Sequence, residues 1–343
     1  MLETIFGSRK PVFIAEIGLN HNGDIDAAEK MIIKAAESGA HAVKFQTFIP
    51  ELMNSPFTDS LMKGQSEPVR DNSIIDFFKS FVFSRDQWIR IKKKAEECGV
   101  VFFSAPFDLP SVELLESLNV PLYKIASSEV TNPPLLKKIA STGKPVIMST
   151  GMSTAGEIGS AIKLLEGGGS GEIVLLHCVS LYPLDDSEAN LSRIISLKER
   201  FGRSVGISDH SRDYSAAMIA SAMGAAVVEK HFKLADDHDC PDKEVSLSPQ
   251  QFREMVTASE RALLMAGDGK IEYSGRESQT ARGARRSLFA AKDMAAGSVL
   301  TEDNITCLRP GTGIPASRIY EFTGRELKTD IKEGSILKPE YFL

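Results

Sequence analysis

The sequence is poor in cysteine and has no long apolar run. Its four cysteines, among 343 residues, are scattered without the C-x-x-C spacing of a metal or redox site. Free thiols in a reducing compartment are the simplest explanation, so we predict a cytoplasmic protein. No apolar run reaches the length of about 18 residues that a transmembrane helix needs. Residues 1–7 lack the basic and apolar regions of a signal peptide. We therefore expect no association with a membrane.

Positive charge is also in short supply. The chain has 40 Lys and Arg against 46 Asp and Glu, which gives a net charge of −6 at pH 7. Nucleic acid is therefore not expected as a partner, and the arginine-rich stretch 276–286 lacks interleaved aromatic residues. The remaining composition, 42% hydrophobic and 25% charged, is typical of a globular protein.

Short apolar runs rich in β-branched residues alternate with segments of helical periodicity. Runs such as Ile173–Leu176 are continuously apolar, as expected for parallel strands that are covered on both faces. Eight strand–helix repeats predict a (β/α)₈ TIM barrel, although an open doubly wound sheet fits the same alternation. The expected strands are Val12–Ile17, Ala42–Thr47, Val100–Ala105, Leu122–Ala126, Pro145–Thr150, Ile173–Val179, Val205–Ser208 and Ala226–Glu229.

Two segments depart from this alternation. Glu51–Phe83 is polar, contains Pro56 and Pro68, and predicts a long loop with a short helix near Ile74–Phe78. Such loops are usually lids or binding segments, and a disordered insertion is the alternative.

The composition changes again after a last barrel helix expected over Gln250–Ala266. Ala296–Ile305 and Glu333–Phe342 share the pattern G-S-Φ-L, in which Φ is apolar. We expect a barrel domain over 1–270, a linker over 271–284 and a small β-rich domain over 285–343.

Two expected strands end in similar polar motifs. Gly206–Ser211 reads G-I-S-D-H-S, and Val227–Phe232 reads V-V-E-K-H-F, with a helical stretch over Ala216–Met223 between them. Neighbouring parallel strands would bring His210 and His231 together at the carboxyl-terminal face of a barrel, where active sites lie. Two neutral imidazoles suit a divalent transition metal with open coordination positions. The alternative is that each histidine only satisfies a buried hydrogen bond.

Most of the expected strands carry polar residues at their carboxyl-terminal ends, and buried charges are costly unless they are paired. Lys44, Lys124 and several hydroxyls suit a phosphate or carboxylate, and a metal beside them would polarise a carbonyl oxygen. An ion pair with a glutamate in the core is the alternative for each lysine. Lys124 could instead form a Schiff base, which needs a desolvated amine.

Taken together, these motifs resemble the sialic acid synthase family over essentially the whole chain. Each motif alone is weak, but the ordered set is specific. The tail resembles the antifreeze-like (SAF) domain of this family. The motifs are A-E-I-G-x-N-H-x-G from Ala15, V-K-F-Q-T from Val43, Y-K-I-A-S from Tyr123, S-T-G-M from Ser149, Y-P from Tyr182, S-D-H-S from Ser208, E-K-H-F from Glu229 and R-P-G from Arg309.

The resemblance implies a metal-dependent enzyme that condenses phosphoenolpyruvate with an N-acetylated aldose. The products would be a nonulosonic acid and phosphate, with C–O cleavage. The aldose would be N-acetylmannosamine or a 2,4-diacetamido-trideoxyhexose. His210 and His231 would bind Mn²⁺, with Mg²⁺ or Co²⁺ as alternatives. The implied assembly is a domain-swapped homodimer, in which Arg309 of one subunit reaches the active site of the other.

The resemblance also assigns roles to individual residues. Glu16 would help to activate or position the attacking water. The implied catalytic residues are Glu16, Glu229, Asp242 and Arg309. The implied substrate-binding residues are Lys44, Lys124, Ser127, Ser149 and Ser208 toward the phosphate and carboxylate, and Gln46 and Tyr182 toward the sugar, which Asp242 would also face. Ser180 is a further substrate-binding residue that could donate a hydrogen bond.

Three positions depart from the family pattern. Ala105 stands where a threonine is common, which removes a possible phosphate donor. Ser180 stands where an asparagine is common. Lys243 replaces the histidine of the usual G-P-D-H motif, which reads C-P-D-K in this chain, and this leaves the identity of the sugar open. Two other functions remain: a Schiff-base pyruvate aldolase and a non-catalytic carbohydrate-binding relative.

Overall fold

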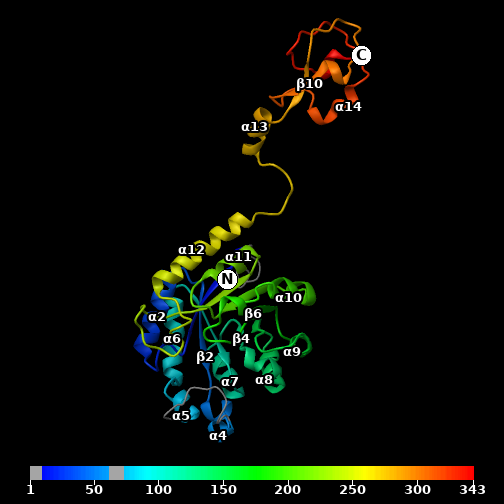
Figure 1. Cartoon of the computed structure of the whole chain (residues 1–343). Coiled ribbons are helices and arrows are strands. Elements are labelled where there is room, and N and C mark those ends of the chain that lie inside the picture. Colours follow the sequence, from blue (N-terminus) through cyan, green and yellow to red (C-terminus); the bar gives the residue numbers. More distant parts are fainter. Residues whose placement is uncertain (1–9, 62–72) are drawn as a thin grey trace. The chain divides into compact units, whose positions relative to one another are not determined.

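The computed structural model of the protein describes residues 10–61 and 73–343. Residues 1–7, from which the absence of a signal peptide was predicted, lie outside the described residues. Residues 62–72 of the predicted loop Glu51–Phe83 also lie outside them. The chain divides into two compact units, Met1–Gly267 and Asp268–Leu343, whose elements are labelled in Figure 1. No helix in the described ranges is long and apolar enough to cross a membrane.

The first unit contains one parallel sheet of eight strands in the order β3-β2-β1-β8-β7-β6-β5-β4. Residues of the two outermost strands, β3 and β4, lie within 8 Å of each other, so the sheet closes into a barrel. The predicted TIM barrel is therefore confirmed, and the open doubly wound sheet is wrong. The strands are β1 (Val12–Gly18), β2 (Ala42–Thr47), β3 (Val101–Pro106), β4 (Tyr123–Ile125), β5 (Val146–Ser149), β6 (Ile173–Cys178), β7 (Val205–Asp209) and β8 (Val227–His231).

Helices follow each strand and cover the outside of the barrel (Figure 1). Most of them begin after a residue whose side chain accepts a hydrogen bond from a free backbone N–H group, as Asp24 does for the first helix. The helices are α2 (Ile25–Glu37), α6 (Arg85–Glu97), α7 (Leu109–Ser117), α8 (Pro133–Ala140), α9 (Ala155–Gly167), α10 (Arg193–Phe201), α11 (Ser215–Ala222) and α12 (Pro249–Ala266), with the 3₁₀ turns η1 (Ser127–Thr131) and η2 (Asp186–Glu188).

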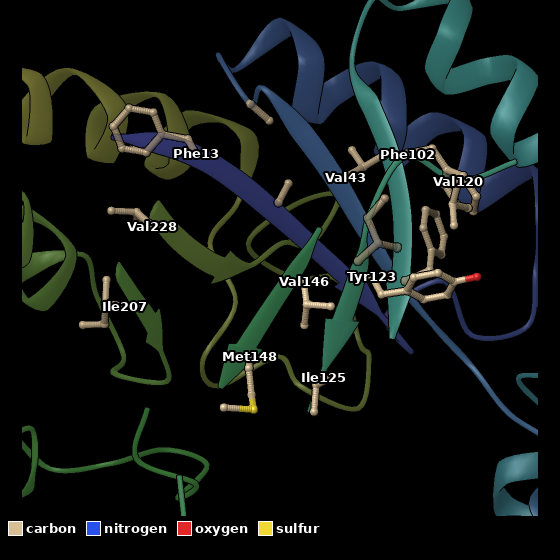
Figure 2. Packing of buried hydrophobic residues seen from close by; sticks show 14 of the residues in the cluster. Phe13, Val43, Phe102, Val120, Tyr123, Ile125, Val146, Met148, Ile207 and Val228 are labelled. Carbon is tan, nitrogen blue, oxygen red and sulfur yellow. The ribbon is translucent and has the colours of Figure 1, made fainter. Parts of the chain in front are cut away.

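The strands separate two apolar clusters because successive side chains point to opposite faces. Val12 and Ile14 belong to a cluster inside the barrel. Phe13, between them, belongs to a larger cluster that packs the strands against the helices. Figure 2 shows part of this outer cluster, including Phe13, Val43 and Phe102. Burial on both faces explains why the strands read as continuous apolar runs.

The segment between β2 and α6 contains more helix than predicted. Its described parts form α3 (Pro50–Met53), α4 (Thr58–Leu61) and α5 (Ile74–Lys79), where one short helix was expected. Phe48 and Phe81 are buried together at its two ends. Local apolar contacts between aromatic residues therefore hold the ends of this segment against the top of the barrel.

The second unit is a small β-rich module. Its strands β9 (Ser287–Ala290) and β10 (Ile305–Leu308) pair antiparallel. The glycines of the two G-S-Φ-L repeats, Gly297 and Gly334, both have left-handed backbone angles (φ 82° and 78°), which glycine adopts without strain. The other elements are α13 (Gly275–Ala284), which lies in the stretch predicted as a linker, α14 (Ile319–Phe322), η3 (Glu302–Asn304), η4 (Ala316–Arg318) and η5 (Pro339–Tyr341).

Candidate active site

A cavity of about 340 Å³ lies at the carboxyl-terminal ends of the barrel strands, which is where barrel enzymes carry their active sites. Every site residue predicted in the barrel lines it, apart from Asp242. Phe107, Ser128, Met152 and Cys178 also line it, although the sequence analysis assigned none of them a role. The predicted residues that line the cavity are Glu16, Lys44, Gln46, Lys124, Ser127, Ser149, Ser180, Tyr182, Ser208, His210, Glu229 and His231.

Strand alternation explains why these side chains share one cavity. Glu16 follows Val12 and Ile14 of the inner cluster at the same two-residue spacing, so it also points inward. The charged residues therefore continue the inner apolar face beyond the packed core. The same spacing relates Lys44 to Ala42, Lys124 to Leu122, Ser149 to Ile147, Cys178 to Leu176 and Glu229 to Val227. This parity would have identified Cys178 from the sequence.

Two lysines and two glutamates form a charge network at the base of the cavity. Lys44 Nζ lies 2.9 Å from Glu16 Oε2 and 3.7 Å from Glu229 Oε1. Lys124 Nζ lies 3.7 Å from the same Glu229 oxygen, which also accepts a hydrogen bond from Ser208 Oγ at 2.9 Å. Both lysines thus form the ion pairs with glutamates that the sequence analysis gave as the alternative. They also line the cavity.

The network shifts the titration of its members in different directions. Burial alone would raise the pKa of Glu229, but Lys124 and Lys44 outweigh it and lower that pKa to about 2. Burial lowers the pKa of Lys44, but Glu16 and Glu229 more than compensate, so the net shift is upward. For Lys124, burial dominates and Glu229 compensates only in part, so its pKa is lowered. Its Nζ donates to Ser149 Oγ at 2.6 Å.

Two glycines allow this close arrangement. The ladder between β1 and β2 is irregular between Glu16 and Gly18, and a Cβ at Gly18 would lie 3.0 Å from Glu16 Oε1. Gly151 N donates to Ser127 Oγ at 3.0 Å, and a Cβ at Gly151 would lie 2.9 Å from that oxygen and closer still to Ser180. A side chain at either position would displace a residue of the cavity wall.

His210 and His231 lie side by side in the cavity wall, with ring centroids 5.4 Å apart. His210 Nδ1 is 2.9 Å from Val179 O, and because a carbonyl oxygen only accepts, Nδ1 donates. That hydrogen bond leaves Nε2 as the ring atom whose lone pair could bind a metal. The ring of Tyr182 stacks on His210, with the ring centroids 4.0 Å apart.

The second histidine has an acidic neighbour: His231 Nδ1 is 3.3 Å from Asp242 Oδ2. Burial lowers the pKa of His231, but the negative charges of Asp242 and Glu16 raise it by more than burial lowers it. The net shift of this pKa is therefore upward.

These observations fit a metal bound by two histidines. Among the described residues, no group of three or more His, Cys, Asp or Glu side chains could hold a metal ion, so water and substrate would have to complete the coordination. Within the same ranges, Glu229 Oε2 is buried without a hydrogen-bond partner. Buried polar atoms are seldom left unpaired unless a ligand or water satisfies them.

Asp242 and Lys243 differ in their relation to the cavity. Asp242 contacts His231 but does not line the cavity. Lys243 is exposed, pairs with Asp239 at 2.9 Å and does not line the cavity. Arg309 follows β10 in the second unit, and its predicted role remains a prediction. Ala105 lines the cavity without the hydroxyl that a threonine would bring.

Comparison with known proteins identifies the relatives of both units. A model of the NeuB family matches residues 31–271, and a model of the SAF domain matches residues 285–342. An N,N'-diacetyllegionaminic acid synthase of Campylobacter jejuni is 38% identical over 96% of this chain and 99% of its own length. A pseudaminic acid synthase of the same organism is 35% identical over 97% of both chains.

A solved structure gives the same picture. The N-acetylneuraminic acid (sialic acid) synthetase of Leptospira borgpetersenii matches with a TM-score of 0.73 and 33% identity, over 80% of this chain and 92% of that one. The predicted resemblance and the predicted SAF domain are therefore confirmed.

Proposed function

The chain belongs to the NeuB family and is an enzyme, and on that premise we propose that it condenses phosphoenolpyruvate with an N-acetylated aldose. The products are a nonulosonic acid and inorganic phosphate. One observation carries the proposal: a single cavity joins two lysines and several hydroxyls to a pair of histidines. The relatives named as synthases of legionaminic and pseudaminic acid support a nonulosonic acid as the product. Because the chain is an enzyme, the non-catalytic alternative is set aside.

The two lysines suit the two anionic groups of phosphoenolpyruvate. Lys44 and Lys124 enter the cavity from β2 and β4, and Ser149 and Ser208 contact Lys124 and Glu229 beside them. A phosphate and a carboxylate both accept charge-assisted hydrogen bonds from such groups. We propose that this side of the cavity holds phosphoenolpyruvate, with Ser127 and Ser180 as further donors.

The histidines suit the other substrate. We propose that His210 and His231 hold a divalent ion. Mn²⁺ is the first choice, and Mg²⁺ and Co²⁺ are the alternatives. Such an ion would polarise the aldehyde oxygen of the open-chain aldose as a Lewis acid. Tyr182 stacks on His210 and Gln46 Nε2 donates to Glu16 Oε1 at 3.3 Å, so both border the space between the histidines and the glutamates. They are the residues that would contact the sugar.

We propose that the glutamates act on C2 of phosphoenolpyruvate. When C3 of phosphoenolpyruvate forms the new bond to the aldehyde carbon, C2 becomes electron-poor, and the carboxylates of Glu16 and Glu229 would stabilise it. Water then adds to C2, with Glu16 positioning it, and cleavage of the C2–O bond releases phosphate. The low pKa of Glu229 keeps this carboxylate charged at neutral pH.

We further propose that the sugar carries two acetamido groups. The relative at 38% identity is named for a diacetylated product. Lys243, which stands in place of the usual histidine, pairs with Asp239 and does not line the cavity. The assay is phosphate release from phosphoenolpyruvate with Mn²⁺, using N-acetylmannosamine, its 6-phosphate and two 2,4-diacetamido-trideoxyhexoses. Release should require both sugar and metal and be fastest with a diacetamido sugar. Release that persists without sugar, or after complete removal of metal by EDTA, would contradict the proposal.

A Schiff-base pyruvate aldolase is the second candidate, because burial lowers the pKa of Lys124. Against it, Lys124 Nζ already donates to Ser149 and faces Glu229. Treatment with pyruvate and borohydride separates the two functions. An aldolase would be trapped as a covalent adduct at Lys124 and would tolerate EDTA, whereas the synthase should give no adduct.

A further inference from the structure

A buried ion pair lies behind the two strands that carry the histidines. Lys230 Nζ is 3.1 Å from Asp209 Oδ2, with side-chain exposures of 0% and 1%. Asp209 of β7 and Lys230 of β8 are direct partners in the parallel register. Each one immediately precedes a histidine in the sequence. The pair therefore joins the two strands at the point where both deliver a ring to the cavity.

The pair lies on the opposite side of the strands from the cavity. Asp209 and Lys230 continue the two-residue spacing of Ile207 and Val228, which belong to the outer cluster (Figure 2). Neither Asp209 nor Lys230 lines the cavity. They are thus placed to act through the backbone and not by contact with a substrate.

The same two side chains also fix the turn that follows His210. Lys230 Nζ donates to Ser211 O at 2.5 Å, and Asp209 Oδ1 accepts from Ser211 N at 2.8 Å. His210 therefore stands between two residues whose positions are held by the ion pair. On its other side, the His210 ring is oriented by Val179 O.

Stability alone does not explain this arrangement. A buried ion pair loses hydration, and well-packed apolar residues of similar volume often replace it without loss of stability. The preceding outward positions on these strands, Ile207 and Val228, are apolar. On each strand, the outward position next to the histidine is charged, whereas the outward position before it is apolar.

We infer that Asp209 and Lys230 are positioning residues that hold His210 and His231 at the separation and orientation that a divalent metal requires, an inference that rests on the metal in the proposed function. Residues behind metal ligands fix ring orientation, and their loss typically weakens metal binding about 10–100-fold. The pair acts on both ligands at once, because it links their two strands.

The test is the affinity of the full-length protein for Mn²⁺, measured by calorimetry and by the electron paramagnetic resonance of free Mn²⁺. The variant is the double substitution Asp209→Asn with Lys230→Met, which leaves no unpaired buried charge. Circular dichroism reports whether it folds. We expect Mn²⁺ binding to weaken about 10–100-fold in the folded double variant. The matched control is Glu116→Gln with Lys144→Met, which removes another lysine–carboxylate pair, 2.5 Å apart, between α7 and the residues just before β5. Its Mn²⁺ affinity should equal that of the wild type.

A second variant decides the question if the double variant does not fold. Asp209→Glu keeps the charge and moves the carboxylate by one methylene, so it should fold, bind Mn²⁺ more weakly and change the resonance spectrum of the bound ion. Wild-type affinity and spectrum in a folded variant would overturn the positioning role and leave the metal assignment intact. A wild-type protein that binds no Mn²⁺ would overturn both.

Discussion

Asn20 and Asp242 are 222 residues apart in the sequence, yet Asn20 Oδ1 accepts a hydrogen bond of 3.0 Å from the backbone N–H of Asp242. Asn20 Nδ2 donates to Ser246 Oγ at 2.8 Å and to Phe232 O at 2.9 Å. The side chain is fully buried. One amide therefore ties the loop after β1 to the loop after β8 and places Asp242 next to His231.

Asn20→Asp should destabilise the protein and impair the use of the sugar. The change replaces the Nδ2 donor by an oxygen that faces Phe232 O, so a buried carbonyl loses its partner. Such a loss costs about 1–3 kcal/mol, and more when a charge is buried. Urea denaturation should show this loss, and KM for the sugar should rise more than KM for phosphoenolpyruvate. The control is Asn22→Asp on the same loop, because the Asn22 bond to Asp239 O is exposed. Equal effects of the two substitutions would exclude Asn20 as the anchor.

His210→Ala and His231→Ala should each abolish metal-dependent phosphate release. Each substitution removes half of the protein ligands in the proposed metal site, and the fold should survive because the rings border a cavity. Phosphate release and Mn²⁺ binding measure the effect. His238→Ala serves as the control, since His238 does not line the cavity. Full activity in either cavity variant would contradict the metal assignment.

Arg309→Ala should lower the use of the sugar, and mixed dimers test whether the tails are exchanged. In a domain-swapped dimer, a subunit with Arg309→Ala and one with His210→Ala should together form one complete site. Dimers refolded from the two variants should then release phosphate faster than either variant alone. If Arg309 serves its own barrel, no site is complete and the mixture gains no activity. An Arg309→Ala protein with unchanged kinetics for the sugar would remove the tail from the site.

Acid should destabilise the protein through His21, which is buried and accepts a hydrogen bond from Gly23 N at 3.0 Å through Nδ1. Burial lowers the pKa of His21 from 6.5 to about 4, and Gly18 and Asp24 compensate only in part. Between pH 6.5 and about 4, His21 is protonated in the unfolded chain but stays neutral in the folded chain. The contribution of His21 to stability is therefore complete above pH 6.5 and is lost as the pH falls to about 4.

The loss through His21 amounts to about 3 kcal/mol at most. Urea denaturation across this range should show a steeper decline for the wild type than for His21→Asn, which has no group that titrates there. Parallel pH profiles of the two proteins would contradict this role of His21.

The sequence alone determined the barrel and most of the cavity wall. Apolar runs, helix starts and the two-residue alternation of strands are local properties, so a strand such as Val12–Gly18 is legible without its neighbours. Once parallel strands are inferred, their carboxyl-terminal ends must meet at one face. The strand ends alone therefore predict that Glu16, Lys44, Lys124 and His231 lie together, and the structure places them in one cavity.

Only the tertiary structure decided which partners these residues have. The bonds of Asn20 to Asp242 and Ser246, and the pairing of Asp209 with Lys230, join positions whose spacing in the sequence carries no signal. The exact register of neighbouring strands and the path of the loops fix such contacts to within an ångström, and the energies of hydrogen bonds and ion pairs change over that distance. Residue types and their periodicity determined the fold, and the closure of the barrel determined the chemistry of each side chain.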